Sequence, residues 1–333
     1  MSSFEATNTK SSMIDLNEHS SLHLVQSLPI WQENEKLESI ASAGESNMNL
    51  VLRVKTNLRS VILKQSKPFV RKFPQIPAPI DRIEIELCYY QLIEDDEILS
   101  SFSPRPLNYN AEHHILLIED LGNGTDFSAM YGQDYTWDSS DFNALSQYLN
   151  ALHELQVSNF PDNLEMKKLN HEHLFQFPFE EENGFDLDSI QPGLQGLSLA
   201  YKRDLDLKSA LEALGKRYLS QGTILLHGDF HPSSWLKTEN GVKFIDTEFA
   251  FMGDCEFDLG VLFAHFDLAQ QDTSCQSNFL KLYRHSYSEK LVDAYRGMEI
   301  MRRLIGIAQL PLSLTLEEKK SLLEKARLLI LSQ

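Results

Sequence analysis

Short apolar segments interrupted by polar turns dominate the first third of the chain. Residues 36–42, 49–56 and 60–65 contain Val, Ile and Leu and are separated by the turn sequences GESN and NLR. Segments of this length between turn signals predict β-strands, and their close spacing favours an antiparallel meander. Residues 112–122, EHHILLIEDLG, predict a further, buried strand that ends in an acidic corner.

Elsewhere the apolar positions recur at helical spacing. In residues 79–94 the apolar side chains of Ile83, Leu87 and Tyr90 fall on one helical face. The region 160–195 has weak periodicity and predicts a loop with short helices. Helices are also predicted over 138–156, which has an Asp or Ser available as N-cap, over 205–221, and over most of 258–332.

A β-rich first part followed by a larger helical part predicts an α+β fold with two lobes. We expect the chain to divide at about residue 120, into a small β-rich N-terminal lobe (1–120, with 1–20 as a loose tail) and a mainly helical C-terminal lobe (121–333). A cleft between two lobes is a usual place for a ligand.

Composition narrows the classes of ligand. The 333-residue chain carries a formal net charge of −18, so nucleic acid and anionic membranes are poor partners for it. Residues 46–80 nevertheless contain no Asp or Glu. A basic stretch in an acidic protein indicates an anionic ligand, and the alternative is a solvated pair of strands. The basic residues of this stretch are Arg53, Lys55, Arg59, Lys64, Lys67, Arg71 and Lys72.

The cysteines and the N-terminal residues indicate the compartment. Cys88, Cys255 and Cys275 are widely spaced, form no CxxC pair and fit a reducing environment. The N-terminal residues are polar and lack the apolar core of a signal peptide, and no apolar run approaches the length of a membrane span. We therefore expect a cytoplasmic protein.

The sequence LLHGDFHPSSWL, residues 225–236, places His227, Asp229 and His231 at alternate positions. Three interpretations of this cluster are possible: a metal site, a general base in a rigid loop, or a polar turn without a chemical role. A hydrolytic zinc site needs three protein ligands and an open position. Gly228 and Pro232 disfavour a helix that would bring both imidazoles onto one face, so a zinc hydrolase stays only as an alternative.

A second acidic motif follows a short predicted hairpin. In VKFIDTEFAF, residues 242–251, a short apolar strand ends in Asp246 and Glu248. A loop aspartate followed by acids at a strand end suits phosphoryl transfer, in which one carboxylate accepts the proton of the attacking hydroxyl and others hold Mg²⁺. The alternative is a satisfied polar turn with exposed acids.

Phosphoryl transfer predicts further parts, which occur in the required order. SVILKQ supplies Lys64 on an early strand, and the next helix supplies Glu86, with Glu84 as competitor, to pair with it. AGESNMNLVLRV supplies Gly44 and the small Ser46 in a turn where backbone N–H groups could approach phosphate. The segment IEDL, residues 118–121, lies where the two lobes should join, a position at which backbone groups could bind adenine.

These motifs together resemble the aminoglycoside phosphotransferase and choline kinase group, and more narrowly methylthioribose kinases. The segments that carry the resemblance are HGDFHPSSWL with FIDTEFAF, GESNMNLVLRV (44–54), VILKQSKPFVRKFPQ (61–75), IDTEFAFMGDCEFDLG (245–260) and EIMRRLIGIA (299–308). The resemblance implies a protein-kinase-like fold, ATP and Mg²⁺ as cofactors, and a small molecule with a hydroxyl group, 5-methylthioribose first, as phosphoryl acceptor. The chain is shorter than a typical methylthioribose kinase.

The resemblance also implies a role for each matching residue. Asp229 would be the catalytic base, and Asp246 and Glu248 would bind Mg²⁺. In the N-terminal lobe the nucleotide would be held by the loop of Gly44, Ser46 and Asn47, by Lys64 steadied by Glu86, and by the backbones of Glu119 and Leu121. Arg302 and Arg303 would face the substrate or the transferring phosphate, and the alternative for this pair is a solvated helix end.

Three positions depart from the commonest pattern of that group. Ser234 stands where most relatives have an Asn that helps to hold Mg²⁺, although methylthioribose kinases resemble this chain in having Ser. Ser46 stands where glycine is frequent. Trp235, next to Ser234, either packs under the loop or lines the substrate site.

Several alternatives remain open from sequence. The acceptor could be another sugar, an amino alcohol or an aminoglycoside-like compound, or the chain could be a nucleotide-binding pseudokinase that acts as a sensor. We predict that His227 and His231 are structural rather than metal ligands, and that Asp258 caps the helix after it and braces the loop. The oligomeric state, a homodimer included, is left open.

Overall fold

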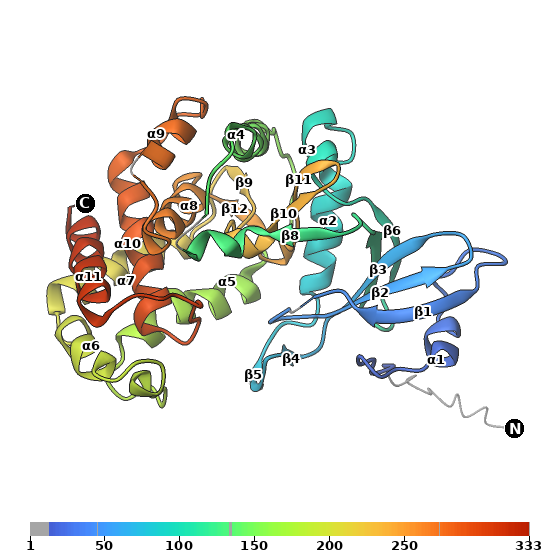
Figure 1. Cartoon of the computed structure of the whole chain (residues 1–333), viewed down its shortest axis with the longest axis horizontal. Helices are drawn as coiled ribbons and strands as arrows, with labels where there is room; N and C mark the ends of the chain where they lie inside the picture. The colour runs from blue at the N-terminus through green and yellow to red at the C-terminus, as the bar shows by residue number, and fades with distance from the viewer. Residues whose placement is uncertain (1–12, 45, 133–134, 273, 333) are drawn as a thin grey trace, which may run out of the picture. The chain divides into compact units, whose positions relative to one another are not determined.

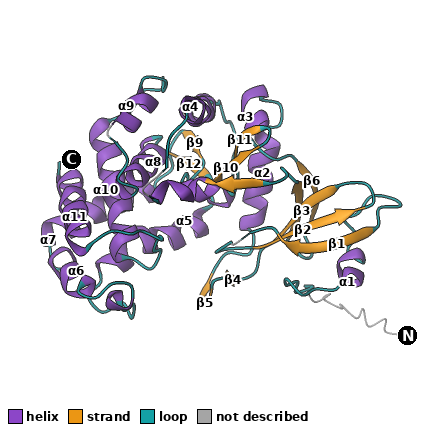
Figure 2. Ribbon diagram, viewed as in Figure 1, coloured by secondary structure: helices purple, strands orange, loops and turns teal. Residues whose placement is uncertain are grey.

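The chain divides into two units in the computed structural model, which describes residues 13–44, 46–132, 135–272 and 274–332. The N-terminal unit comprises Met1–Ile83 and Pro106–Asp120, and the C-terminal unit comprises Glu84–Arg105 and Leu121–Gln333. Figures 1 and 2 show that strands predominate in the first unit and helices in the second.

An antiparallel five-stranded sheet, in the order β1-β2-β3-β7-β6, forms the centre of the N-terminal unit (Figure 1). Its first three strands are the predicted meander, and β7 is the predicted buried strand. Apolar side chains from β2, β3 and β7 form the core of the unit. The elements are α1 (Leu22–Gln26), β1 (Leu37–Ser42), β2 (Leu50–Thr56), β3 (Ser60–Gln65), β4 (Phe69–Val70), β5 (Phe73–Pro77), β6 (Pro106–Asn110) and β7 (Ile115–Glu119).

Residues 13–20, expected to belong to a loose tail, are anchored on this sheet. The side chain of Leu16 is fully buried in the core of the unit. The Gln65 side chain accepts a hydrogen bond from the Leu16 N–H at 3.0 Å and donates one to the Ile14 carbonyl at 2.7 Å. Burial of one leucine and the exchange of backbone hydrogen bonds with Gln65 offset the entropy of ordering this segment. Residues 1–12 lie outside the described residues.

Residues 84–105 group with the C-terminal unit, whereas the sequence pattern placed them in a lobe of residues 1–120. They contain most of α2 (Arg82–Ile93) and all of α3 (Glu97–Phe102). The Tyr89 and Tyr148 hydroxyls lie 2.5 Å apart, and the Phe102 ring packs against Tyr148 and Phe244 at centroid distances of 6.2 and 5.6 Å. These aromatic contacts join the segment to the C-terminal unit, and helical periodicity alone could not reveal them.

The C-terminal unit is mainly helical, with two small antiparallel sheets among the helices. In α8 most residues are buried, because the helix is apolar on nearly all sides and packs against α10. The helices are α4 (Ser139–Glu154), α5 (Leu164–His171), α6 (Leu194–Lys202), α7 (Leu205–Leu219), α8 (Glu256–Leu268), α9 (Ser274–Leu280), α10 (Glu289–Ile305) and α11 (Leu316–Leu331). The predicted N-cap of α4 is confirmed, since Asp138 and Asp141 form a capping box.

Short strands of the C-terminal unit form two small sheets that carry the loops of interest. One has the order β11-β10-β8 and the other pairs β12 with β9, all antiparallel. The strands are β8 (Gly124–Asp126), β9 (Ile224–Leu226), β10 (Trp235–Thr238), β11 (Gly241–Phe244) and β12 (Phe251–Gly253). Short helical turns link them: η1 (Phe127–Tyr131), η2 (Glu172–Gln176), η3 (Phe177–Phe179), η4 (Leu187–Ser189), η5 (Pro232–Ser234) and η6 (Thr247–Phe249).

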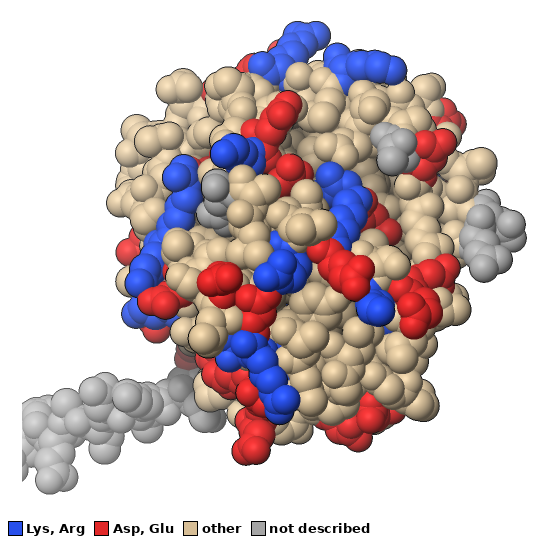
Figure 3. Space-filling view, turned by 90° about the vertical axis from the view of Figure 1, so that its left-hand side faces the viewer, with Lys and Arg blue, Asp and Glu red and all other residues tan. Residues whose placement is uncertain are grey.

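Charges of both signs are interspersed on the face of the C-terminal unit that carries α6, α7 and α11 (Figure 3). Local pairs account for much of this mixing, among them Lys216 with Glu212 at 2.6 Å and Arg217 with Asp254 at 2.7 Å. Among the described residues no helix is both long and apolar enough to cross a membrane.

Candidate functional site

The loop between β9 and β10 is held in one conformation by a glycine and a buried aspartate. Gly228 has φ +79°, and a Cβ at this position would lie 2.1 Å from the Phe249 carbonyl oxygen. The fully buried Asp258 carboxylate accepts hydrogen bonds from the N–H groups of His227 at 2.8 Å and Gly228 at 3.1 Å. The predicted bracing role of Asp258 is therefore confirmed. The predicted capping role is wrong, because Cys255 is the N-cap of α8 and the Asp258 carboxylate is occupied by the loop.

Both ring nitrogens of His227 bond to backbone groups. Nδ1 accepts from the Asp229 N–H at 3.4 Å, so Nε2 carries the proton and donates to the Ile245 carbonyl at 3.0 Å. Burial lowers the pKa of His227, against the opposing effects of Asp258 and Asp229, and keeps the ring neutral. The structural role predicted for His227 is confirmed. With both nitrogens engaged, the ring is not available as a zinc ligand.

Asp229 follows this glycine with its carboxylate partly open to solvent, the side chain being 20% exposed. His231 Nδ1 accepts from the Ser233 N–H at 3.2 Å, so its Nε2 is the nitrogen that donates to Asp229 Oδ2, also at 3.2 Å. Burial by itself raises the pKa of Asp229, but His231, Arg302 and Arg303 together hold the pKa well below its ordinary value. The carboxylate is therefore an anion throughout the neutral range.

Arg302 and Arg303 of α10 form an ionic cluster with Glu299 inside the protein, so they are not a solvated helix end. Their side chains are 13% and 7% exposed. Both bind the fully buried Glu299 of the same helix, Arg302 Nη1 at 2.9 Å from Oε2 and Arg303 Nε at 2.6 Å from Oε1. Both also lower the pKa of Asp229. The predicted residues Asp229, Arg302 and Arg303 are therefore close enough in the structure for their charges to interact.

Asp246 occupies a backbone conformation that non-glycine residues seldom adopt. It follows β11 with φ +66° and ψ 53°, in the left-handed region. Such strain costs roughly 1–3 kcal/mol and is found at functional sites more often than elsewhere. The neighbouring backbone is fixed, since the Ile245 N–H donates to the Ser234 carbonyl at 3.0 Å.

Glu248 lies two residues further on in η6 and is buried, with 4% of the residue exposed. The buried Asn163 donates from Nδ2 to the backbone carbonyls of Glu248 at 3.0 Å and Ala250 at 2.9 Å. Asn163 therefore fixes the turn that carries both acids, Asp246 and Glu248. Nothing in the weakly periodic region 160–195 signalled this residue from sequence.

Glu86 and Asp246 share a neighbour in the C-terminal unit. The fully buried Tyr90, on α2, donates from its hydroxyl to Glu86 Oε1 at 3.0 Å. Burial raises the pKa of Tyr90 well above its ordinary value, and the charges of Glu86 and Asp246 raise it further. Glu86, expected to pair with the strand lysine, and Asp246, expected to bind metal, therefore both act on the same tyrosine.

Ser234 and Trp235 are both directed into the protein. The Ser234 hydroxyl donates to the Asp229 carbonyl at 3.2 Å, and the residue is 2% exposed. Trp235 is fully buried, with its ring 5.2 Å from Phe230 and 5.7 Å from Phe127. The sequence left two positions open for Trp235, under the loop or in the substrate site, and the structure shows it under the loop. The predicted contact of its side chain with substrate is not seen in this structure, because aromatic rings cover the indole.

The candidate nucleotide residues of the N-terminal unit lie on β3, on β7 and in the β1–β2 turn. Lys64 is buried on β3, opposite Val51 and Leu116. Gly44 has φ +139°, and Ser46 and Asn47 offer their carbonyls to Arg71 Nη1 and the Lys72 N–H, each at 3.0 Å. Glu119 ends β7, and Leu121 is the first residue after the N-terminal unit.

Much of the charge in the basic stretch 46–80 is already paired with acids from other segments. Arg53 binds Asp120 at 2.9 Å and Arg59 binds the buried Glu35 at 2.8 Å. Two further pairs join Lys67 to Asp15 and Arg71 to Glu18. These partners lie outside the stretch, so its composition overstated the positive charge left for an anionic ligand.

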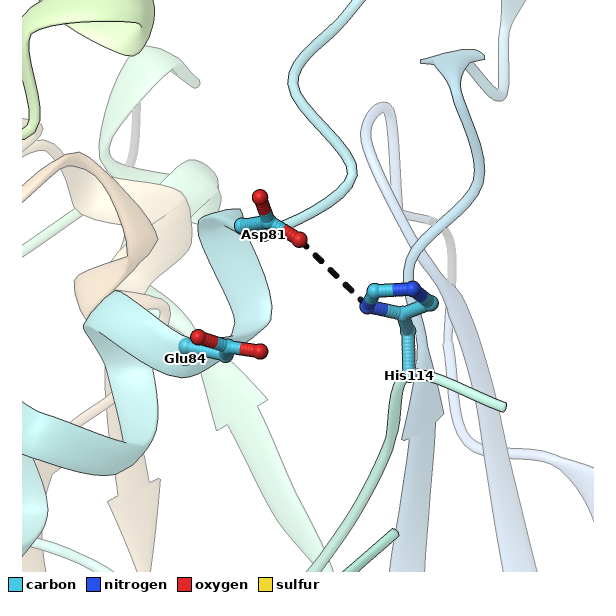
Figure 4. A group of neighbouring side chains, drawn as sticks. All are labelled: Asp81, Glu84 and His114. Carbon is cyan, nitrogen blue, oxygen red and sulfur yellow. Dashed lines mark ion pairs between the residues drawn. The ribbon is translucent and has the colours of Figure 1, made fainter. Parts of the chain in front are cut away.

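In the N-terminal unit His114 lies near the carboxylate of Asp81 (Figure 4). Its Nδ1 lies 3.7 Å from Oδ1 of Asp81, whose side chain is 73% exposed. An exposed pair at this distance contributes little to stability. Carboxylate oxygens suit Mg²⁺, and Asp246 and Glu248 are the acids for which the sequence predicted this role.

Comparison with known proteins places the chain in a family. The profile of the phosphotransferase enzyme family matches residues 41–302. The chain belongs to this phosphotransferase enzyme family. It is 26% identical over 272 residues to methylthioribose kinase 2 of Oryza sativa subsp. japonica, and 30% identical over 238 residues to a methylthioribose kinase of Yersinia pseudotuberculosis. These alignments include 77% and 65% of this chain but only 63% and 56% of the respective relatives.

Solved structures of a choline kinase and an aminoglycoside phosphotransferase share the fold. A choline kinase from Streptococcus pneumoniae is 17% identical with a TM-score of 0.54, over 89% of this chain and 94% of that one. An ADP-bound aminoglycoside phosphotransferase is 13% identical with a TM-score of 0.51, over 92% and 97% of the two chains. These likenesses confirm the predicted α+β, kinase-like fold with a β-rich N-terminal and a mainly helical C-terminal region.

Sequence reasoning missed three residues that connect with one another or with the predicted residues of this region. Glu299 holds the arginine pair, His265 of α8 lies against His231, and Tyr131 binds His265. The spacing Glu-x-x-Arg-Arg in α10 was a usable signal for Glu299, because residues three and four apart share a helix face. No local pattern links Tyr131 to His265, which are far apart in the chain.

Proposed function

We propose that this phosphotransferase family member is an ATP-dependent kinase that transfers the γ-phosphoryl group to a hydroxyl of a small molecule, with 5-methylthioribose as the first candidate acceptor. One observation carries the proposal. Asp229 is held as a partly exposed anion in a fixed loop, and the charges of the half-buried Arg302 and the buried Arg303 act on it and can meet a transferring phosphate. The similarity to methylthioribose kinases supports the choice of acceptor.

In this proposal Asp229 orients the acceptor hydroxyl. A carboxylate whose pKa is held so low is a weak base, so it takes the proton only as the new O–P bond forms. Its main contribution is then to align the hydroxyl for in-line attack. Arg302 and Arg303 supply positive charge near the position where charge develops.

Asp246 and Glu248 would hold Mg²⁺. Their carboxylate oxygens are the hard ligands that this ion prefers, and the strained turn fixes where they lie. When bound, the ion neutralises charge on the nucleotide phosphates. The Ser234 hydroxyl already donates to Asp229, and its proposed contact with the metal would use its free lone pairs.

The N-terminal unit would bind ATP. Lys64 would contact the α and β phosphates with Glu86 as its partner, and the turn of Gly44, Ser46 and Asn47 would approach them through backbone N–H groups. Glu119 and Leu121 would meet adenine through their backbones. On the basis of these roles we propose that residues 1–120 bind the nucleotide and that residues 121–333 carry out catalysis and bind the acceptor.

A coupled ADP-release assay with Mg²⁺ATP tests the proposal. The acceptor panel should contain methylthioribose, another pentose, choline and an aminoglycoside, so that the alternatives compete directly. We expect Asp229→Asn to lower kcat by about 10²–10⁴-fold. The matched control is Asp206→Asn, which removes an exposed carboxylate from the first turn of α7 and should leave kcat unchanged.

The outcomes separate the hypotheses. Turnover with methylthioribose alone, lost in Asp229→Asn, supports the proposed acceptor. Turnover with choline or the aminoglycoside instead keeps the kinase chemistry and replaces the acceptor. ATP binding without turnover for any acceptor, unchanged in Asp229→Asn, favours the nucleotide-binding pseudokinase and contradicts the proposal.

A further inference from the structure

Glu299 lies at the centre of a buried polar network that joins α8 and α10 to the Asp229 loop. The residue is fully buried. Its Oε1 accepts from Arg303 Nε at 2.6 Å, its Oε2 accepts from Arg302 Nη1 at 2.9 Å, and Oε1 lies 3.3 Å from His265 Nε2. Burial by itself raises the pKa of Glu299, but the two arginines hold it well below its ordinary value. A charged carboxylate removed from water needs such partners.

His265 connects this carboxylate with His231. Burial lowers the pKa of His265 to about 3, so the ring is neutral. Because Nε2 faces the Glu299 anion, it carries the proton, and Nδ1 accepts from the Tyr131 hydroxyl at 2.6 Å. The His265 ring lies against the ring of His231, with a centroid distance of 5.6 Å and an interplanar angle of 34°. His231 in turn donates to Asp229.

The two arginines keep donors that Glu299 does not use. Among the described residues, Arg302 Nε and Arg303 Nη2 are buried and have no hydrogen-bond acceptor. Buried donors of this kind are costly unless a ligand satisfies them at some stage. Glu299 binds Nη1 of Arg302 and Nε of Arg303, and these bonds determine where the remaining N–H groups point.

We propose that Glu299 is a positioning residue for phosphoryl transfer: it aims the free N–H groups of Arg302 and Arg303, and through His265 it holds the His231 ring against Asp229. The inference rests on the proposed kinase function. It differs from a purely structural role, in which Glu299 only compensates the buried charge of the arginines and the geometry around Asp229 is maintained without it.

The principal test is Glu299→Gln, which keeps the shape of the side chain and removes its charge. In the ADP-release assay we expect kcat to fall by about 10²-fold while KM for ATP changes by less than about threefold, because nucleotide binding uses other residues. Glu299→Asp, which restores the charge one methylene shorter, should recover part of kcat. Glu289→Gln, at the exposed start of the same helix, is the matched control.

A double-mutant cycle separates positioning from stability. If Glu299 acts through Arg303, then Glu299→Gln combined with Arg303→Gln should lose no more kcat than Arg303→Gln alone. Multiplicative losses, or a kcat per folded molecule equal to that of the wild type, would overturn the inference. If Glu299→Gln does not fold, Tyr131→Phe takes its place. It removes only the hydroxyl bound to His265, and a kcat equal to that of the wild type would again count against the network.

A readout without turnover distinguishes failure of this inference from failure of the proposed function. The imidazole resonances of His231, assigned with His231→Gln, should shift in Glu299→Gln and stay in place in Glu289→Gln. A shift supports the connection through His265 even if no acceptor in the panel is phosphorylated. Unchanged His231 resonances in a folded Glu299→Gln protein refute the connection even if the wild type is an active kinase.

Discussion

Gly228→Ala tests whether a single close backbone approach fixes the loop of Asp229. The new Cβ would lie 2.1 Å from the Phe249 carbonyl oxygen, so one of the two backbone segments must move. The left-handed conformation costs an L-residue roughly 1–2 kcal/mol, and overpacking against the backbone adds about 1–3 kcal/mol. We therefore expect unfolding free energy to fall by about 2–5 kcal/mol.

The chain offers a matched control for the strain alone. Gly241, the first residue of β11, has φ +92°, but a Cβ there would meet nothing within 4 Å. Gly241→Ala should therefore lose only about 1–2 kcal/mol. The difference between the two variants isolates the contact with Phe249, because both carry the same change of side chain in a similar backbone conformation.

Urea unfolding followed by tryptophan fluorescence measures both stabilities, and the ADP-release assay measures the consequence for Asp229. A displacement of this carboxylate by about 1 Å should lower kcat by about 10²-fold in Gly228→Ala. Equal stability losses in the two variants would refute the reasoning, because they would show that the loop relaxes away from Phe249 at little cost.

Three further predictions concern the acids, the histidines and the buried tryptophan. Asp246→Asn should keep the fold, because Asn tolerates the left-handed region, yet abolish Mg²⁺-dependent turnover; retained turnover would contradict the metal-binding role. His227 and His265 have lowered pKa values, the latter about 3, so the unfolded chain binds protons that the folded one does not as pH falls below about 6.5. The free energy of unfolding should therefore fall as the pH decreases, by up to about 1.4 kcal/mol per pH unit for each histidine. Urea midpoints that stay constant between pH 7 and pH 5 would show that the two rings are not both buried and neutral. Trp235→Phe should lower stability by roughly 1–3 kcal/mol and leave KM for the acceptor unchanged, whereas a raised KM with unchanged stability would place the indole in the substrate site.

Some features of the site were predictable because they are local in sequence. The order HGD, a hairpin and an Asp-x-Glu strand end places Asp229 before the hairpin and Asp246 and Glu248 after it, and the structure has these elements where the pattern predicted them. The strands 36–42, 49–56 and 60–65 were also recognisable, since apolar periodicity reports the secondary structure of the segment that contains it.

Pairings between distant segments were not predictable in this way. Residues 13–20 bind Gln65, residues 84–105 pack on aromatic rings of the C-terminal unit, and the basic side chains of 46–80 find acids elsewhere in the chain. A sequence pattern shows which side chains need a partner, but the partner is chosen by proximity in the folded chain.

The sequence alone was enough to predict most strands and helices, a non-helical loop at Asp229, and the acids suited to phosphoryl transfer. The burial of Trp235 under other rings, and the contacts of Glu299 with Arg303 and of His265 with His231, could be seen only in the folded chain. The physical reason is that periodicity and turn chemistry act over a few residues, whereas burial and charge pairing depend on which surfaces meet when the chain folds.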